Sequence, residues 1–253
     1  IPQFDMERNY IDFHKDILSF IPSERVYNDE IRRFAWGTDA GFYRLVPQLV
    51  VRAANETEVS RLMVSASRYG VPVTFRAAGT SLSGQSVSDS VLVVAGKHWE
   101  DYTVLDNGSK IRLQPGVVGS RVNDILRPYS RKFGPDPASI KSCMVGGIVM
   151  NNASGMSCGT TANSDRMLLD ARIVFADGFV LDTSDPQSRS MFIASHPEMI
   201  SHILTLRDEI RSDYGLTQRI LHKYSIKNVT GLNILPFVTF DDPIEIILHL
   251  LVG

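Results

Sequence analysis

The residues best suited to chemistry lie in a loop rich in Gly, Ser and Thr. It follows Val71 to Phe75, which is typical of a β-strand, and it reads Arg76-Ala77-Ala78-Gly79-Thr80-Ser81-Leu82-Ser83-Gly84-Gln85-Ser86. Small residues let successive backbone N–H groups turn toward one centre and form an anion-binding nest. The hydroxyls add donors and Arg76 adds charge, so the loop suits a pyrophosphate group. An ordinary surface loop of turn residues would have the same composition.

Two common phosphate motifs do not match this loop. Gly79 and Gly84 have the Walker spacing, but Gln85 occupies the position of the required lysine. No G-x-G-x-x-G sequence opens a helix after a strand, so a Rossmann nucleotide site is not supported.

A second Gly-rich stretch, from Phe133 to Thr161, is predicted to be a loop and suits a large planar ligand with polar edges. Pro135 and Pro137 are rigid, Gly146-Gly147 permits close backbone approach, and Asn151, Asn152 and Ser154 offer neutral donors and acceptors. Methionine side chains can pack against an aromatic face, and three are nearby: Met144, Met150 and Met156. A turn-rich connection with core methionines would look similar.

The elements that must position these loops form an α+β pattern. Asn55 and Glu58 predict a capped helix that ends at Gly70, and Val91 to Ala95 predicts a second strand. Asn107-Gly108 and Asp177-Gly178 predict hairpins, the first with a two-residue turn. Further helices are predicted from Ser120, near Pro197, and after the cap Asp242. This order is not a regular βαβ alternation.

Composition narrows the class of protein. The 253 residues carry a net charge of −2 and are 43% hydrophobic, which argues against disorder and against a dedicated nucleic-acid binder. Cys143 and Cys158 are too few for a disulfide scaffold. No apolar run approaches the ~20 residues of a membrane span, and the N-terminus lacks signal-peptide features. We therefore expect a cytoplasmic protein.

Together, in this order, the two stretches resemble a known family. The segment Tyr43 to Thr183 is similar to the PCMH-type FAD-binding domain of the vanillyl-alcohol oxidase type, through the stretches RAAGTSLSGQ, LQPGV, GPDPAS, VGGIVMNNASG and DARIVFADGFVLDT. Within that family it is most similar to the D-lactate, glycolate and D-2-hydroxyglutarate dehydrogenase branch. The resemblance implies two α/β subdomains with FAD between them.

The resemblance also implies which residues bind the cofactor. The first loop would wrap the FAD pyrophosphate, the second stretch would line the nucleotide, ribityl and flavin parts, and a later strand would meet the adenine end. The residues are Arg76, Ala77, Ala78, Gly79, Thr80, Ser81, Gly84 and Gln85, then Pro135, Gly146, Gly147, Asn151, Asn152, Ser154, Gly155, Gly159 and Thr160, then Ile173 and Val174.

Two positions depart from the family pattern. Ala77 and Ala78 replace the usual glycines, which would be costly if the backbone there needed a positive φ. Members that bind flavin covalently often carry histidine where Thr80 stands, so we expect noncovalent FAD.

The resemblance implies a domain organisation but no catalytic residue. We expect a helical extension over residues 1–40, the FAD domain over 41–183 with subdomains dividing near 97–115, and a helical remainder over 184–253 that ends before a substrate cap. The six histidines stand in no catalytic or metal motif, so no base and no metal is assigned. We expect the chain to be the N-terminal portion of a longer protein.

The resemblance implies a flavin-dependent oxidation of a 2-hydroxyacid, of the D-lactate or D-2-hydroxyglutarate type. Electrons would pass to a quinone, a cytochrome or an iron–sulfur domain, and any iron–sulfur cluster would lie in a part beyond this chain. The whole protein could associate peripherally with the inner face of the membrane. Two alternatives stay open: a non-catalytic FAD-holding subunit, and an alditol or aromatic-alcohol oxidase of the same fold.

Overall fold

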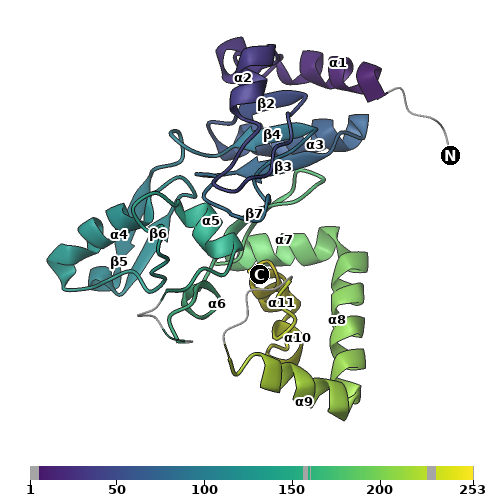
Figure 1. The fold of residues 1–253 in the computed structure, drawn as a ribbon. Helices are drawn as coiled ribbons and strands as arrows, with labels where there is room; N and C mark the ends of the chain where they lie inside the picture. Colours follow the sequence, from purple (N-terminus) through teal and green to yellow (C-terminus); the bar gives the residue numbers. More distant parts are fainter. Residues whose placement is uncertain (1–5, 156–158, 160, 227–231, 253) are drawn as a thin grey trace. The chain divides into compact units, whose positions relative to one another are not determined.

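The computed structural model describes residues 6–155, 159, 161–226 and 232–252 (Figure 1). Two compact units contain helices and strands together, as the α+β prediction requires. Unit 1 comprises Ile1–Lys132, Ser139–Gly147 and Val174–Phe179. Unit 2 comprises Phe133–Ala138, Ile148–Ile173 and Val180–Gly253. In the described part of the chain, no helix is long and apolar enough to cross a membrane.

Unit 1 is built on a four-stranded sheet of order β1-β2-β4-β3. The strand β1 (Val26–Tyr27) is antiparallel to β2 (Leu49–Arg52), whereas β2, β4 (Val91–Val94) and β3 (Val73–Arg76) run parallel. All four residues of β4 are buried, as expected for a central parallel strand covered on both faces. The carboxyl ends of β2, β3 and β4 therefore meet at one edge of the sheet.

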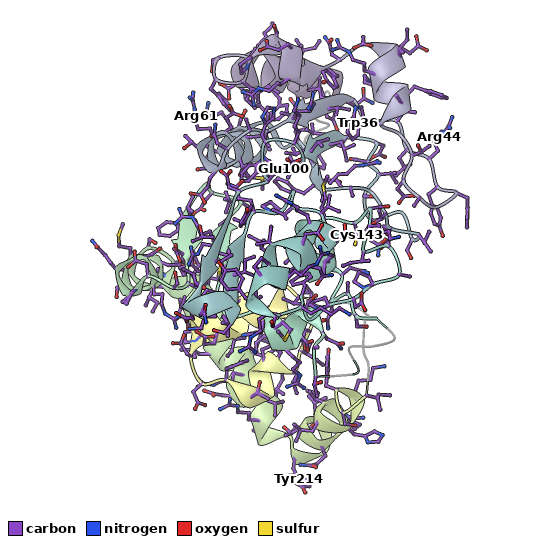
Figure 2. All side chains as sticks on the ribbon, turned by 90° about the vertical axis from the view of Figure 1, so that its left-hand side faces the viewer. Trp36, Arg44, Arg61, Glu100, Cys143 and Tyr214 are labelled. Atoms are coloured by element: carbon purple, nitrogen blue, oxygen red, sulfur yellow. The ribbon has the colours of Figure 1, made fainter. Side chains whose placement is uncertain are left out.

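The helix α3 (Glu56–Tyr69) follows the predicted signals closely. The side chain of Asn55 accepts a hydrogen bond from Glu58 N at 2.9 Å, and Gly70 closes the helix in the left-handed region with φ +64°. Val59, Leu62 and Ala66 are buried, whereas Arg61 is exposed and its guanidinium lies 4.1 Å from the Phe20 ring centroid (Figure 2). The predicted capped amphipathic helix is confirmed.

Alternate strand residues face two apolar clusters. Val51 and Val93 pack with α3 and with Phe13 of α1 (Met6–Ile17). On the other face, Leu92 and Val94 pack with Trp36, which follows α2 (Glu30–Ala35). Full burial of one such side chain contributes about 1.5–3 kcal/mol, so both faces of the sheet hold unit 1 together.

The predicted first hairpin is present, but its turn differs from the prediction. β5 (Tyr102–Leu105) pairs with β6 (Lys110–Leu113), and Leu105 stands opposite Lys110. Residues 106–109 lie between the paired positions, so the Asn107-Gly108 dipeptide is part of a four-residue connection that contains a 3-10 turn. The helix α4 (Gly119–Leu126) follows and ends before a 3-10 turn containing Pro128, as its missing N–H predicts.

The second Gly-rich stretch is not a loop throughout, which corrects the prediction. Val145–Met150 forms the helix α5. Val145 and Ile148 are buried, and a Cβ on Gly146 would come within 2.8 Å of the Pro115 Cβ. Gly146 therefore serves close packing inside a helix, and the irregular backbone begins only after Met150.

The later elements include a hairpin and a group of helices. β7 (Arg172–Val174) and β8 (Val180–Asp182) pair around the predicted Asp177-Gly178 turn. In unit 2, Arg189 ties α7 to α11, with Nη2 2.6 Å from Asp242 Oδ2 and Nη1 2.9 Å from Glu245 Oε1. The unit's helices are α6 (Ser164–Met167), α7 (Pro186–Ser195), α8 (Pro197–Ser212), α9 (Tyr214–Lys223), α10 (Pro236–Thr239) and α11 (Pro243–Leu250).

Candidate cofactor site

The first predicted loop leaves the carboxyl end of β3 and has unpaired backbone donors. The N–H groups of Ala77, Ala78 and Thr80 have no hydrogen-bond partner among the described residues. Two turns in this loop use glycine, with φ +71° at Gly79 and +79° at Gly84. Unpaired N–H groups on a loop after a parallel strand are suited to bind an anion.

Ala77 and Ala78 fit the loop without backbone strain. Neither belongs to the described non-glycine residues with positive φ, so the larger side chain requires no left-handed conformation there. The cost that would follow from replacing the usual glycines is therefore absent. Both side chains instead line a cavity.

Arg76 anchors the loop through its guanidinium. Nη1 lies 2.6 Å from the Thr38 carbonyl oxygen and 3.4 Å from those of Trp36 and Ser86. Desolvation by burial lowers the pKa of Arg76, and the nearby Asp39 carboxylate opposes that change. Nε is buried and has no hydrogen-bond partner among the described residues. Arg76 thus holds unit 1 segments together, and a direct contact with phosphate stays a prediction.

Gly79 lies directly against that guanidinium. A Cβ at Gly79 would come within 2.5 Å of Arg76 Cζ, and the residue also has a positive φ. The amide of Ala40 donates to the Gly79 carbonyl at 3.0 Å. Space and backbone conformation therefore both require glycine at this position.

The polar side chains of the loop lie near its apex. The hydroxyl of Ser81 donates to Gln85 Oε1, and Gly84 lies against the ring of Tyr43, where a Cβ would be 3.3 Å away. Thr80 is half-buried. The prediction that FAD is held without a covalent bond at Thr80 stays a prediction.

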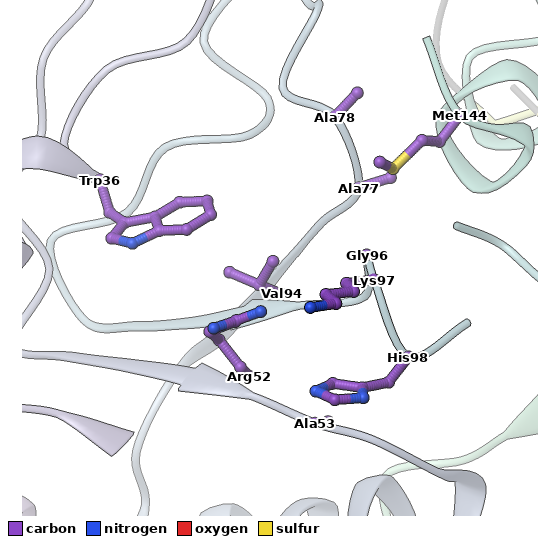
Figure 3. A pocket seen from close by; sticks show the side chains of 10 residues that line it. All are labelled: Trp36, Arg52, Ala53, Ala77, Ala78, Val94, Gly96, Lys97, His98 and Met144. Carbon is purple, nitrogen blue, oxygen red and sulfur yellow. The ribbon is translucent and has the colours of Figure 1, made fainter. Parts of the chain in front are cut away.

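A cavity of about 250 Å³ lies beside Ala77 and Ala78 in unit 1 (Figure 3). Figure 3 shows the side chains of Arg52, Lys97 and His98 directed toward the same space, with the Trp36 ring on another side. Arg52, Lys97, His98 and Trp36 were not among the site residues predicted from the sequence. Arg52 ends β2, and Lys97 and His98 follow β4 closely. For Lys97 and His98, which follow a predicted strand, the available signal was the rule that ligands bind beyond the carboxyl ends of parallel strands. Arg52 offered no such signal, because its strand was not predicted from the sequence. The lining residues are Trp36, Arg52, Ala53, Ala77, Ala78, Val94, Gly96, Lys97, His98 and Met144.

The structure divides the other predicted site residues between its units. Gly146, Gly147 and Val174 belong to unit 1, together with the loop after β3. The predicted residues Thr160, Cys158 and Met156 lie outside the described residues. Unit 2 contains Pro135, Asn151, Asn152, Ser154, Gly155, Gly159 and Ile173.

Asn152 has a structural role in unit 2. It is 3% exposed with φ +41°, and its Oδ1 accepts a hydrogen bond from Asp165 N at 3.1 Å. Gly155 packs against the carbonyl of Asp136, where a Cβ would clash. These contacts fix the backbone on either side of Ser154.

Ser154 fits a ligand-binding role. It is 8% exposed, and its Oγ is buried without a hydrogen-bond partner among the described residues. Most buried polar groups in proteins are paired, so an unpaired hydroxyl is the expected state of a donor whose partner is a ligand. By contrast, the neighbouring Ser164 Oγ donates to the Ile148 carbonyl at 3.0 Å. In unit 1, the free N–H groups and the cavity suit the phosphates of a dinucleotide. In unit 2, taken by itself, the Ser154 hydroxyl suits a polar group of a ligand.

Burial affects two of the described histidines, His249 and His14. His249 of α11 stacks on Phe240, with ring centroids 4.8 Å apart, and burial is the main cause that lowers its pKa. Burial also lowers the pKa of His14. In the described part of the chain, no three His, Cys, Asp or Glu residues are grouped to hold a metal.

Comparisons with known proteins agree with this geometry. Two solved structures superpose on about two thirds of the chain. An alkyldihydroxyacetonephosphate synthase matches with a TM-score of 0.58 and 19% identity over 68% of this chain and 38% of its own. The xylooligosaccharide oxidase of Myceliophthora thermophila C1 matches with a TM-score of 0.57 and 15% identity over 68% of this chain and 36% of its own. At these identities the likeness establishes the fold, which confirms the predicted PCMH-type class.

Residues 47–184, more than half of the chain, match the FAD binding domain family. The chain therefore belongs to this family of FAD-binding domains.

Curated proteins are also similar to this chain. The glycolate oxidase subunit GlcD of Escherichia coli K12 is 33% identical over 141 residues, which are 55% of this chain and 28% of that protein. The D-2-hydroxyglutarate dehydrogenase of Haemophilus influenzae is 24% identical over 245 residues, 90% of this chain and 24% of that protein. The chain thus spans about a quarter of the length of these relatives.

Proposed function

We propose that this chain is the FAD-binding part of a flavin-dependent oxidoreductase that oxidises a 2-hydroxyacid of the D-lactate or D-2-hydroxyglutarate type. The observation that carries the proposal is the loop after β3, with its unpaired N–H groups at Ala77, Ala78 and Thr80, in a chain of the FAD binding domain family. The relatives named as acting on glycolate and D-2-hydroxyglutarate support the substrate class.

In this proposal, each unit contributes its own residues. The N–H groups of the unit 1 loop bind the pyrophosphate, with Arg76 and Gly79 fixing their direction. In unit 2, the Ser154 hydroxyl donates to a polar group of the cofactor, and Asn152 holds the backbone beside it. Bound FAD supplies a two-electron acceptor for the hydride of the substrate carbon.

Anaerobic reduction of the flavin tests the substrate class. The whole protein that contains this chain is loaded with FAD, mixed with D- and L-2-hydroxyacids in turn, and followed by the loss of flavin absorbance. We expect D-lactate or D-2-hydroxyglutarate to bleach the flavin. Bleaching by L-acids alone would contradict the stereochemistry, and bleaching by alditols or aromatic alcohols alone would contradict the substrate class. A bound flavin that no substrate reduces would instead indicate a non-catalytic FAD-holding subunit.

A further inference from the structure

We infer that Arg52 and Lys97, with His98 as a neighbouring hydrogen-bond donor, form a cationic site that binds the pyrophosphate of the dinucleotide and selects it over flavins that lack phosphate. This assignment rests on the proposed FAD binding, and it adds side chains that the loop after β3 does not contain. The juxtaposition that carries it is the cavity of about 250 Å³, which Arg52, Lys97 and His98 line together with Ala77 and Ala78 (Figure 3).

The position of the three residues follows from the sheet. Arg52 is the last residue of β2, while Lys97 and His98 come shortly after β4, and these parallel strands are neighbours with Arg52 opposite Val94. The loop after β3 leaves from the other side of β4, where Arg76 also stands opposite Val94. The cations and the unpaired N–H groups are therefore brought to the same edge of the sheet by strand register.

Arg52 and Lys97 have no carboxylate partner among the described residues. None of the described residues that line the cavity is acidic. Lys97 and His98 have no ion pair or hydrogen bond with any described residue, and Arg52 donates only to Tyr27 Oη, at 3.1 Å. Elsewhere in unit 1, by contrast, Arg25 is paired with a carboxylate at 2.6 Å. Cations gathered without a counter-charge repel one another, so an anion in the cavity would relieve that repulsion.

The size and shape of the cavity favour a diphosphate. It is too small for a complete FAD molecule, but it accommodates the compact, doubly charged group at the centre of the dinucleotide. Ala77 and Ala78 line the cavity, and their N–H groups have no hydrogen-bond partner among the described residues. Charge-assisted hydrogen bonds are roughly twice as strong as neutral ones, so side-chain cations add substantially to binding by N–H groups.

Titration of the 253-residue chain tests the assignment with three probes: FAD, riboflavin and inorganic pyrophosphate. Binding is measured by calorimetry and by the fluorescence of the tryptophans, one of which, Trp36, lines the cavity. The variants Lys97→Met and His98→Gln change exposed side chains, so folding should be retained. The matched control is Lys15→Met on α1, which removes the same charge from a residue outside the cavity.

We expect Lys97→Met to weaken FAD and pyrophosphate binding about tenfold, which is the effect of losing one charge-assisted hydrogen bond. Riboflavin binding and the Lys15→Met variant should be unchanged, and added salt should weaken FAD binding to the wild type more than to Lys97→Met. If Lys97→Met and His98→Gln bind FAD as tightly as the wild type does, and also bind pyrophosphate as tightly as the wild type does, the cationic site is overturned. FAD binding by the chain would remain intact in that case. Failure of the wild-type chain to bind FAD would instead overturn the proposed function.

Discussion

Replacement of Gly79 by alanine should damage the loop through two separable effects. The residue has φ +71°, and an added Cβ would come within 2.5 Å of Arg76 Cζ. An L-residue in the left-handed region costs about 1–2 kcal/mol. Moving the guanidinium away would also lose the hydrogen bond from Nη1 to the Thr38 carbonyl, a charged bond contributing about 1.5–3 kcal/mol. The two effects together predict that the free energy of unfolding falls by about 2.5–5 kcal/mol.

Gly70 offers a matched control for the backbone effect alone. It has a similar conformation, with φ +64°, but a Cβ there would meet no atom within 4 Å. Gly70→Ala should therefore lower the free energy of unfolding by only about 1–2 kcal/mol. The assay is urea unfolding of wild type, Gly79→Ala and Gly70→Ala, each with and without FAD.

We expect Gly79→Ala to be less stable than Gly70→Ala and to lose most of its FAD affinity, whereas Gly70→Ala should bind FAD as the wild type does. Equal stabilities of the two variants would refute the contact between Gly79 and Arg76. Normal FAD affinity in Gly79→Ala would refute the role of this loop in binding the cofactor.

Two further predictions concern buried polar groups. Glu58→Gln should lower the free energy of unfolding by about 3 kcal/mol in urea at pH 7, because Glu58 is 9% exposed and bonds Arg25 at 2.6 and 2.7 Å. Burial alone would raise the pKa of Glu58, but hydrogen bonds from Arg25 and Ala54 N outweigh it and lower the pKa. The stabilisation is therefore complete above about pH 4.3 and is lost as the pH falls through the lower folded-state pKa, so the difference between variant and wild type should shrink at pH 3. A difference independent of pH would contradict this assignment. Ser154→Ala should raise the stability of the FAD-free chain by about 1 kcal/mol, because it removes an unpaired buried hydroxyl, yet weaken FAD binding severalfold. Its control, Ser164→Ala, loses the hydrogen bond to the Ile148 carbonyl and should therefore be less stable than the wild type. Unchanged FAD affinity in Ser154→Ala would contradict a ligand-binding role for Ser154.

Local sequence signals predicted local structure well. The Asn55–Glu58 cap, the apolar positions of α3 and the left-handed Gly70 are contacts within a few residues of one another, so the sequence contains them in full. The strand β4 was equally clear because its run of valine and leucine is buried on both faces. The predicted α+β class followed from the order of such elements, whereas the predicted family rested on the resemblance of the Gly-rich stretches to known FAD-binding domains.

The features that sequence reasoning missed depend on contacts between distant segments. The helix α5 contains Gly146 and Gly147, whose low helix propensity favours a loop, but burial of Ile148 and close packing of Gly146 on Pro115 outweigh that propensity. The segment Leu49–Arg52 was not predicted to be a strand from the sequence. It is recognised as a strand of the sheet through its parallel pairing with β4. Without that strand, no pattern could bring Arg52 beside Lys97.

The sequence also did not predict which parts of the protein the site residues Arg76 and Asn152 contact. Arg76 was expected to offer its charge to a phosphate, whereas its Nη1 contacts three backbone carbonyls from elsewhere in unit 1. Asn152 was expected to face a ligand, but its side chain oxygen accepts a hydrogen bond from Asp165 N. The ligand-binding roles of Arg76 and Asn152 stay predictions, while their contacts with the protein itself required the structure.

Equilibrium titration of the 253-residue chain with FAD tests the central claim most directly. We predict saturable uptake of one FAD per chain, seen as a change in flavin absorbance and fluorescence. Acid precipitation should release the flavin completely, because Thr80 offers no covalent attachment. A chain that remains colourless after refolding with excess FAD would contradict the claim that it binds this cofactor.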